Sequence, residues 1–421
     1  MRPSTGQHPT RRTRALAGLL CLLWSAEAIC AAPGEVEAYV ALALAEHPRL
    51  VAAREAHAAA RERVAGQRSL PDPQVSVGGF AQSVETRVGP QRVRVALQQT
   101  LPWPSQLIQA GQAALAQADA ADRGRSAEER AVREQVERTY WQLWQLRAVR
   151  ALQEEHRVLL EGVADAVRGR VSIGTASLAD LQQVELSRSR LEDRIESLAA
   201  AEVGAVAELR AAVGTASEAM ETRSSPALVG LPEGEGLDAA SHPKLQALSA
   251  RADAADHQAR AAAGQRLPDI TVGVDWIATG PAALPGVSDS GKDAVAVGVG
   301  VSVPLWQGVY GHDVASARHD EAAWRARRTA TEDALQATIA STAAQVRDTA
   351  RRAERIDATL LPQARAAYDA VLGEYTVGRS GVASVLLAQR ALLDLAVEHA
   401  EAQAAHRVQW ARLTALTGRE P

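Results

Sequence analysis

The side chains best suited to chemistry in this sequence are the histidines, and four of them form two pairs with the same spacing. His312 and His319 are seven residues apart, and so are His399 and His406. Histidine nitrogens bind transition metals or transfer protons. On a helix, residues seven apart are separated by two turns, too far for both to bind one metal ion without a bend. The spacing therefore predicts surface or helix-packing residues, and no metal site.

Other signals of catalysis are missing from the sequence. It contains neither a glycine-rich phosphate loop nor the nucleophile elbow of hydrolases. Its two cysteines are too few for a disulfide framework or a zinc cluster. A net charge of −4 gives no basic footprint for nucleic acid. We expect a protein that is not an enzyme, needs no cofactor and binds no nucleic acid.

The composition predicts long alanine-rich helices. The 421 residues are 47% hydrophobic but only 3% aromatic, so alanine and aliphatic side chains supply most of the apolar surface. This apolar content is too high for a disordered chain. No stretch after residue 40 is long and apolar enough for a membrane-spanning helix. The fold class that we expect is therefore mainly α.

Residues 1–31 resemble an export signal. Arg11, Arg12 and Arg14 precede a short apolar stretch at residues 15–24, and small residues follow at residues 28–32. This order predicts a cleaved secretory signal peptide. Lipidation of Cys30 is an alternative that Ile29 disfavours. Removal of residues 1–31 would leave a chain without cysteine, which suits an oxidising compartment.

The rest of the chain contains one pattern twice. The phrase at residues 45–50, Ala-Glu-His-Pro-Arg-Leu, returns at residues 240–245 as Ala-Ser-His-Pro-Lys-Leu. Residues 171–174, Val-Ser-Ile-Gly, return at residues 375–378 as Tyr-Thr-Val-Gly. These matches keep their order, which predicts a tandem duplication. We place repeat 1 at residues 32–223, a linker at residues 224–236 and repeat 2 at residues 237–421.

Each repeat is predicted to contain a helix, two strands, a long helix, a tight turn and a second helix. The strands are expected at about residues 74–83 and 91–100, and at about residues 270–279 and 293–304. In the second of them, apolar residues alternate with Arg92, Arg94 and Gln98, and in the third valines alternate with polar residues such as Asp275. This two-residue period predicts strands with one apolar and one polar face. The first helix is expected over Val36–Leu70, where Pro71 stops it.

Four strands of about ten residues are long enough to cross a bilayer but too few to close a barrel. Open sheet edges are not tolerated in lipid. If the strands span a membrane, several chains must therefore pool them, and a trimer would supply twelve. A small soluble sheet with one wet face is the alternative.

The long helices are the second unusual feature. Pro104 to about Arg170 contains no further proline and would be about 100 Å long as one helix. Its counterpart, Tyr310 to Tyr375, contains Pro362, which should kink or break it. Their shorter partners are expected over Ser177–Val213 and Val382–Leu416. Helices of this length joined by tight turns predict a coiled coil, and a periplasmic coiled-coil spacer is the simplest alternative.

The duplicated order of elements, the two His-Pro-x-Leu phrases and the glycine turns resemble the TolC-like outer membrane factor family over nearly the whole chain after residue 31. The phrase Gln99-Thr-Leu-Pro-Trp-Pro104 is similar to the CzcC/CusC type, which works with heavy-metal RND pumps. Ser105 and Gln106 follow it, where Gly-Lys is commoner in that subgroup.

The resemblance implies a homotrimer in the outer membrane of a Gram-negative envelope. Three chains would share a 12-stranded β-barrel in the lipid, continuous with a trimeric α-helical barrel in the periplasm. Such a protein is the passive exit duct of an efflux system, driven by an inner membrane RND pump and joined to it by a periplasmic adapter. In that arrangement the valines face lipid, and Arg92, Arg94, Gln98 and Asp275 face the lumen.

The same resemblance makes the two glycine turns the periplasmic tips that dock the adapter. The residues assigned to docking are Gly174, Thr175, Ser177, Gly378, Arg379 and Ser380. Family members often carry acidic residues six and nine positions after the second tip glycine, but Ser384 and Leu387 occupy those positions here. Asp180, six residues after Gly174, is instead a candidate for a cation-attracting constriction. The alternative is that Asp180 only stabilises a helix N-terminus.

The function expected from the sequence is therefore efflux through an outer membrane channel, with heavy-metal cations as the cargo. A drug-efflux or type I secretion channel is the first alternative. A structural periplasmic coiled-coil protein is the second, and the alternating valine strands argue against it.

Overall fold

The computed structural model describes residues 34–82, 84–215, 220–231 and 237–418. The predicted signal peptide, Cys30 and residues 232–236 of the predicted linker lie outside these residues. All the described helices and strands belong to one compact unit, Gly34–Pro421.

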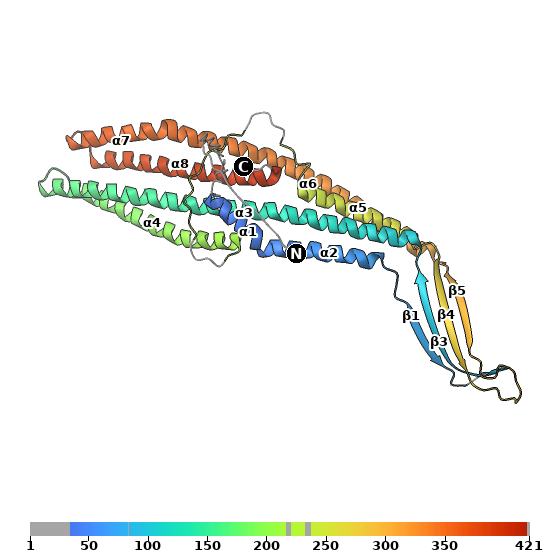
Figure 1. The fold of residues 1–421 in the computed structure, drawn as a ribbon. Coiled ribbons are helices and arrows are strands. Elements are labelled where there is room, and N and C mark those ends of the chain that lie inside the picture. The colour runs from blue at the N-terminus through green and yellow to red at the C-terminus, as the bar shows by residue number, and fades with distance from the viewer. Residues whose placement is uncertain (1–33, 83, 216–219, 232–236, 419–421) are drawn as a thin grey trace, which may run out of the picture. The chain divides into compact units, whose positions relative to one another are not determined.

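Helices make up most of this unit, which confirms the mainly helical class. They are α1 (Glu35–Glu46), α2 (Pro48–Arg68), α3 (Pro104–Ser172), α4 (Leu178–Val213), α5 (Pro243–Gly264), α6 (Gln307–Arg355), α7 (Leu361–Thr376) and α8 (Val382–Thr417). A π-helical segment, Ile356–Leu360, joins α6 to α7. Within this unit the helices run side by side, with α3 and α4 next to α7 and α8 at the end away from the strands (Figure 1). None of the described helices combines the length and the apolar character that a membrane span requires.

The strands form one antiparallel sheet. They are β1 (Gln74–Gly79), β2 (Glu85–Thr86), β3 (Gly89–Leu101), β4 (Asp269–Thr279) and β5 (Ala294–Ser302). The order is β1-β3-β4-β5, and the short β2 pairs with β3. The β3–β4 pairing joins the two halves of the chain, with Leu97 opposite Val274 in the register.

The prediction of a single helix over Val36–Leu70 is wrong, because the helix is interrupted between α1 and α2. His47 leaves the helical conformation, and its Nδ1 accepts a hydrogen bond from the Arg49 backbone N–H at 3.1 Å. Pro48 then starts α2 at a position where its missing N–H has no cost. His242 and Pro243 begin α5 in the same way, with a 3.1 Å bond from the Lys244 N–H to His242 Nδ1. The duplicated His-Pro phrase is therefore a helix start.

Two other boundaries differ from the expected ones. β1 ends at Gly79, short of the expected residue 83, and β5 ends at Ser302, short of Pro304. Pro362 lies in the first turn of α7, and the π-helical segment before it absorbs the lost hydrogen bond, so the helix continues.

The largest hydrophobic cluster fixes α1, α2 and α4 on α3. Val136, Tyr140 and Leu143 lie at helical spacing on one face of α3 and are completely buried against Leu50 of α2 and Leu209 of α4. Burial of side chains of this size contributes about 1.5–3 kcal/mol each. This packing makes α3 the axis on which the other helices are arranged.

The segment 220–231, between α4 and α5, is tied to both halves of the chain. The Ser224 N–H donates to the Tyr140 hydroxyl at 3.1 Å, and that hydroxyl donates to Glu35 at 2.6 Å. Further along, the Val229 N–H donates to Nε2 of His406 on α8 at 3.0 Å. We call residues 220–231 the equatorial strap. Its backbone N–H groups donate to side chains of α1, α3 and α8, and these hydrogen bonds fix the connection between the two halves of the chain.

Acidification is expected to destabilise the fold. Burial lowers the pKa of His156 and of His242 to about 4, and it also lowers the pKa of His406. Above pH 6.5 these histidines are neutral in both the folded and the unfolded chain. Below it the unfolded chain binds protons that the folded chain does not, so stability falls down to the folded pKa. A shift from 6.5 to about 4 corresponds to about 3 kcal/mol for one histidine.

Thermal unfolding followed by circular dichroism between pH 7 and pH 4 measures this loss. The His156→Leu variant removes one of the three groups and should lose less stability than the native chain over this range. His312 is exposed, so His312→Leu is the control and should leave the pH dependence as it is. An unchanged slope in His156→Leu would contradict the assignment.

Candidate functional site: an apolar sheet face and two helical tips

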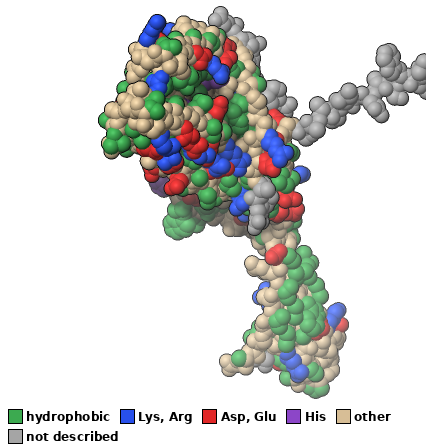
Figure 2. Space-filling view, turned by 90° about the vertical axis from the view of Figure 1, so that its left-hand side faces the viewer, with side chains coloured by type: hydrophobic (Ala, Val, Ile, Leu, Met, Phe, Trp, Pro, Cys, Tyr) green, Lys and Arg blue, Asp and Glu red, His purple; other side chains and the backbone are tan. Residues whose placement is uncertain are grey.

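One face of the sheet is apolar and exposed. Residues opposite each other in the register lie on the same face, as Val77, Val95, Trp276 and Val295 do across the four strands. Val297, in the middle of β5, has an exposed fraction of 79%. Figure 2 shows hydrophobic side chains gathered over the strands. A continuous apolar surface of this kind is typical of contact with a partner or a membrane.

The other face of the same sheet is polar or small. Asp275 on β4 lies one strand away from Arg94 on β3, and their Nη2 and Oδ1 atoms form an ion pair of 2.8 Å. Gln98 lies opposite Gly273, whereas Arg92 lies at a register shift between Gln91 and Val93, where the regular alternation of β3 is interrupted. The structure therefore brings Arg94, Gln98 and Asp275, three of the four residues predicted to line a lumen, onto one face. Whether that face lines a lumen stays a prediction.

The two outer strands each have one free edge among the described residues. β1 pairs only with β3, and β5 pairs only with β4. Unpaired backbone N–H and C=O groups along both edges are ready to pair with another strand. Since β1 and β5 run in opposite directions, β5 of one chain can pair antiparallel with β1 of a second.

At the opposite end of the helices, two glycine turns reverse the chain. Gly174 and Gly378 both have φ of +77°, a left-handed conformation that glycine adopts without strain. Behind each turn a backbone N–H returns to the preceding helix, from Thr175 to the Arg170 carbonyl and from Arg379 to the Glu374 carbonyl, both at 2.9 Å. This is the hydrogen-bond pattern of a glycine helix cap. Nothing lies within 4 Å of a Cβ built on either glycine, so both tips are open to solvent.

The helix after each turn begins differently. Asp180 takes part in a capping box, in which its N–H donates to the Ser177 hydroxyl at 3.1 Å and its carboxylate accepts from the Ser177 N–H at 3.0 Å. Asp180 therefore acts as a helix cap in this structure, whatever further role it has. α8 begins after Gly381 without a side-chain cap, and Ser380 precedes that glycine.

The sequence did not predict that the two tips contact each other. The guanidinium of Arg170, at the end of α3, donates to the backbone carbonyls of Tyr375 and Thr376 at 2.9 and 3.0 Å. It also lies 4.3 Å from the centre of the Tyr375 ring. Val167, Val184 and other apolar residues of both helix pairs form a common cluster beside them. Tyr375 occurs only in the second repeat, so comparison of the repeats gave no signal for this contact.

The histidines do not form a metal site in the part of the chain that the structure describes. No group of three or more His, Cys, Asp or Glu side chains there is arranged to hold a metal ion. His312 and His319 are exposed, and His406 is fully buried against the equatorial strap. The sequence spacing did not reveal this structural role of His406.

A curated relative, the outer membrane efflux protein BepC of Brucella suis biovar 1 (strain 1330), is 28% identical over 292 residues, which cover 66% of this chain and 61% of BepC. The match therefore spans about three fifths of that relative's length.

Solved structures show the same fold at low identity. The outer membrane protein VceC of Vibrio cholerae aligns with a TM-score of 0.75 and 19% identity over 91% of this chain and 96% of VceC. CusC aligns with a TM-score of 0.79 and 15% identity over 91% of this chain and 92% of CusC. At such identities the likeness establishes the fold and not the cargo.

The family match covers both halves of the chain. The outer membrane efflux protein family matches residues 39–215 and again residues 238–419, with the equatorial strap between the two matches. This agrees with the expected location in the outer membrane. The protein belongs to the outer membrane efflux protein family.

Proposed function

We propose that three copies of this chain form an outer membrane exit duct. The observation that carries this proposal is the sheet, which has an exposed apolar face and two free, antiparallel edges. Pairing of β5 with β1 of the next chain removes every edge, and three chains then close twelve strands into a barrel. The apolar face then contacts lipid, and Arg92, Arg94, Gln98 and Asp275 line the lumen.

The helices form the periplasmic part of the same duct in this proposal. A periplasmic adapter docks at the tips, on Gly174, Thr175, Ser177, Gly378, Arg379 and Ser380, and an inner membrane RND pump supplies the energy. The glycine turns at Gly174 and Gly378 support this role of the tips, because a glycine turn without a side chain leaves a smooth surface for a partner helix. The duct itself is passive.

The cargo that we propose is heavy-metal cations. The support is the phrase at residues 99–104, which resembles the heavy-metal subgroup. Drugs and secreted polypeptides are the competing cargoes, since cargo choice resides largely in the pump.

Two measurements test the proposal. Heat-modifiable trimers in the outer membrane fraction are expected, and their absence would contradict the duct. A deletion strain is expected to become sensitive to heavy-metal salts and to recover with the plasmid-borne gene. Sensitivity to drugs alone would reject the metal cargo while leaving the duct intact.

Asp180 gives a separate prediction about the constriction. We propose that three copies of Asp180 attract cations near the tips, in addition to capping α4. The Asp180→Asn variant should then reduce cation selectivity of trimers in planar bilayers about two- to threefold, because a ring of negative charge is lost. Ser177→Ala weakens the same cap by about 1 kcal/mol without changing the charge and is the matched control. Equal selectivity in Asp180→Asn and the native chain would leave Asp180 as a cap only.

A further inference from the structure

A cavity of about 480 Å³ lies near the middle of the helices, between α3, the start of α5 and the end of α8. Three arginines of α3 line it, and they are Arg123, Arg130 and Arg133. None of the three forms an ion pair with another of the residues that the structure describes. The single acid in the lining, Glu129, is bound by Arg125 at 2.6 Å. The lining of the cavity therefore carries more positive than negative charge.

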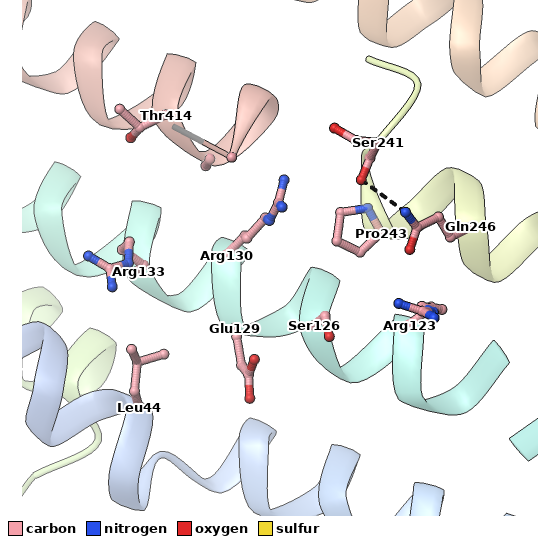
Figure 3. A pocket seen from close by; sticks show the side chains of 12 residues that line it. Leu44, Arg123, Ser126, Glu129, Arg130, Arg133, Ser241, Pro243, Gln246 and Thr414 are labelled. Atoms are coloured by element: carbon pink, nitrogen blue, oxygen red, sulfur yellow. Dashed lines mark hydrogen bonds between the residues drawn. The ribbon is translucent and has the colours of Figure 1, made fainter. Parts of the chain in front are cut away.

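Arg130 is the central cation of this cavity. Its Nη1 atom is buried and has no hydrogen-bond partner. Figure 3 shows its side chain extending from α3 into the space between Thr414 of α8 and the start of α5, where Ser241 precedes the helix and Pro243 begins it. Glu129 points to the opposite side of α3. A buried guanidinium N–H without an acceptor is costly, and an anion that accepts two parallel N–H bonds removes that cost.

The ends of two helices border this cavity and add partial charges of opposite sign. The N-terminus of α5, at Pro243, borders the cavity, and a helix N-terminus carries partial positive charge. Burial lowers the pKa of the neighbouring His242, and the charges of Arg130 and Lys244 lower it further. The C-terminal end of α8 adds partial negative charge through Gly418, against which the Arg130 guanidinium is packed. No acceptor of that helix end, however, bonds to Nη1.

We infer that this cavity binds a small free oxyanion of the phosphate or sulfate class, held by Arg130 and Arg123 at the start of α5. A lipid headgroup is not the source, because Arg123 lies nineteen residues along α3 from its strand end at Pro104, about 30 Å away. The bound anion joins α3, α5 and α8, and so braces the junction between the two halves beside the equatorial strap.

Binding of inorganic phosphate to the purified full chain tests this inference. Isothermal titration and the thermal unfolding midpoint are measured in phosphate and in chloride of equal ionic strength. The native chain should bind phosphate saturably, with a higher midpoint than in chloride, because a ligand of the folded state stabilises it. Arg130→Gln should weaken binding at least tenfold and remove the phosphate-specific rise. Arg123→Gln should weaken binding several-fold.

Arg138→Gln is the matched control. It removes the same charge from the same helix, where Arg138 has only a 3.8 Å contact with Glu134, and it should bind phosphate like the native chain. Equal phosphate binding in Arg130→Gln and in the native chain would overturn the inference. The absence of saturable phosphate binding by the native chain would also overturn it. In that case weaker trimers in Arg130→Gln would show that a carboxylate of a second copy of the chain, and not a free anion, binds Arg130.

Discussion

Lysine in place of Val297 is expected to prevent the assembly of trimers in the outer membrane. Val297 lies in the middle of β5 on the apolar face, with 79% of its side chain exposed. In the proposed barrel that side chain contacts lipid near the centre of the bilayer, where a lysine costs about 2–4 kcal/mol in each chain. Heat-modifiable trimers in the outer membrane fraction should fall to a few per cent of the native amount, and efflux-dependent resistance should disappear with them.

Ala296→Lys is the matched control, because it places the same charge one residue away on the opposite face. Ala296 lies opposite Asp275 in the β4–β5 register, so a lysine there faces an existing carboxylate. Trimers should persist in this variant. A soluble sheet with its apolar face against solvent would tolerate both lysines, and equal amounts of trimer in the two variants would therefore reject the membrane assignment.

Tryptophan in place of Gly174 is expected to abolish efflux while the trimers remain. The left-handed backbone at this tip makes any side chain cost about 1–2 kcal/mol, which a chain of this size can absorb. The space around Gly174 is empty, so the ring does not disturb the fold and instead occupies the surface proposed for the adapter. Crosslinking to the adapter and resistance of the complemented strain should both fall at least tenfold.

The Gly174→Ala variant separates strain from bulk at this tip. Alanine has the same backbone strain as tryptophan but adds only one methyl group, so resistance should stay near the native level. The same pair of substitutions at Gly378 should behave alike. Loss of resistance in both alanine variants would show that backbone strain, and not docking, explains the effect, and intact resistance in Gly174→Trp would reject docking at this tip.

Regular periodicity made the strands and the tips predictable. The alternation of Val93, Val95 and Leu97 with polar residues is local, and it fixes which side chains share a face in any antiparallel pairing. The tip glycines could be found because each stands in a phrase that both halves contain. A pattern that repeats along the chain needs no knowledge of the fold to be recognised.

Contacts between distant residues could not be found in this way. His406 and Val229 are 177 residues apart, and Arg170 and Tyr375 are 205 apart, so no local spacing relates them. The break between α1 and α2 was missed for a different reason. The apolar residues keep helical spacing through residues 36–70, so their pattern shows no break. The break is confined to His47, whose side chain caps the next helix and replaces a lost helical hydrogen bond.

The difference between the two tips has a consequence for symmetry. One turn leads into a capping box of Ser177 and Asp180, and the other into an uncapped start at Gly381. In the proposed trimer the two kinds of tip alternate around a ring of six that has only threefold symmetry. Six identical partner molecules would then occupy two kinds of binding site, three of each kind. The two kinds of site would differ in affinity, so the partner molecules at the tighter sites would bind first.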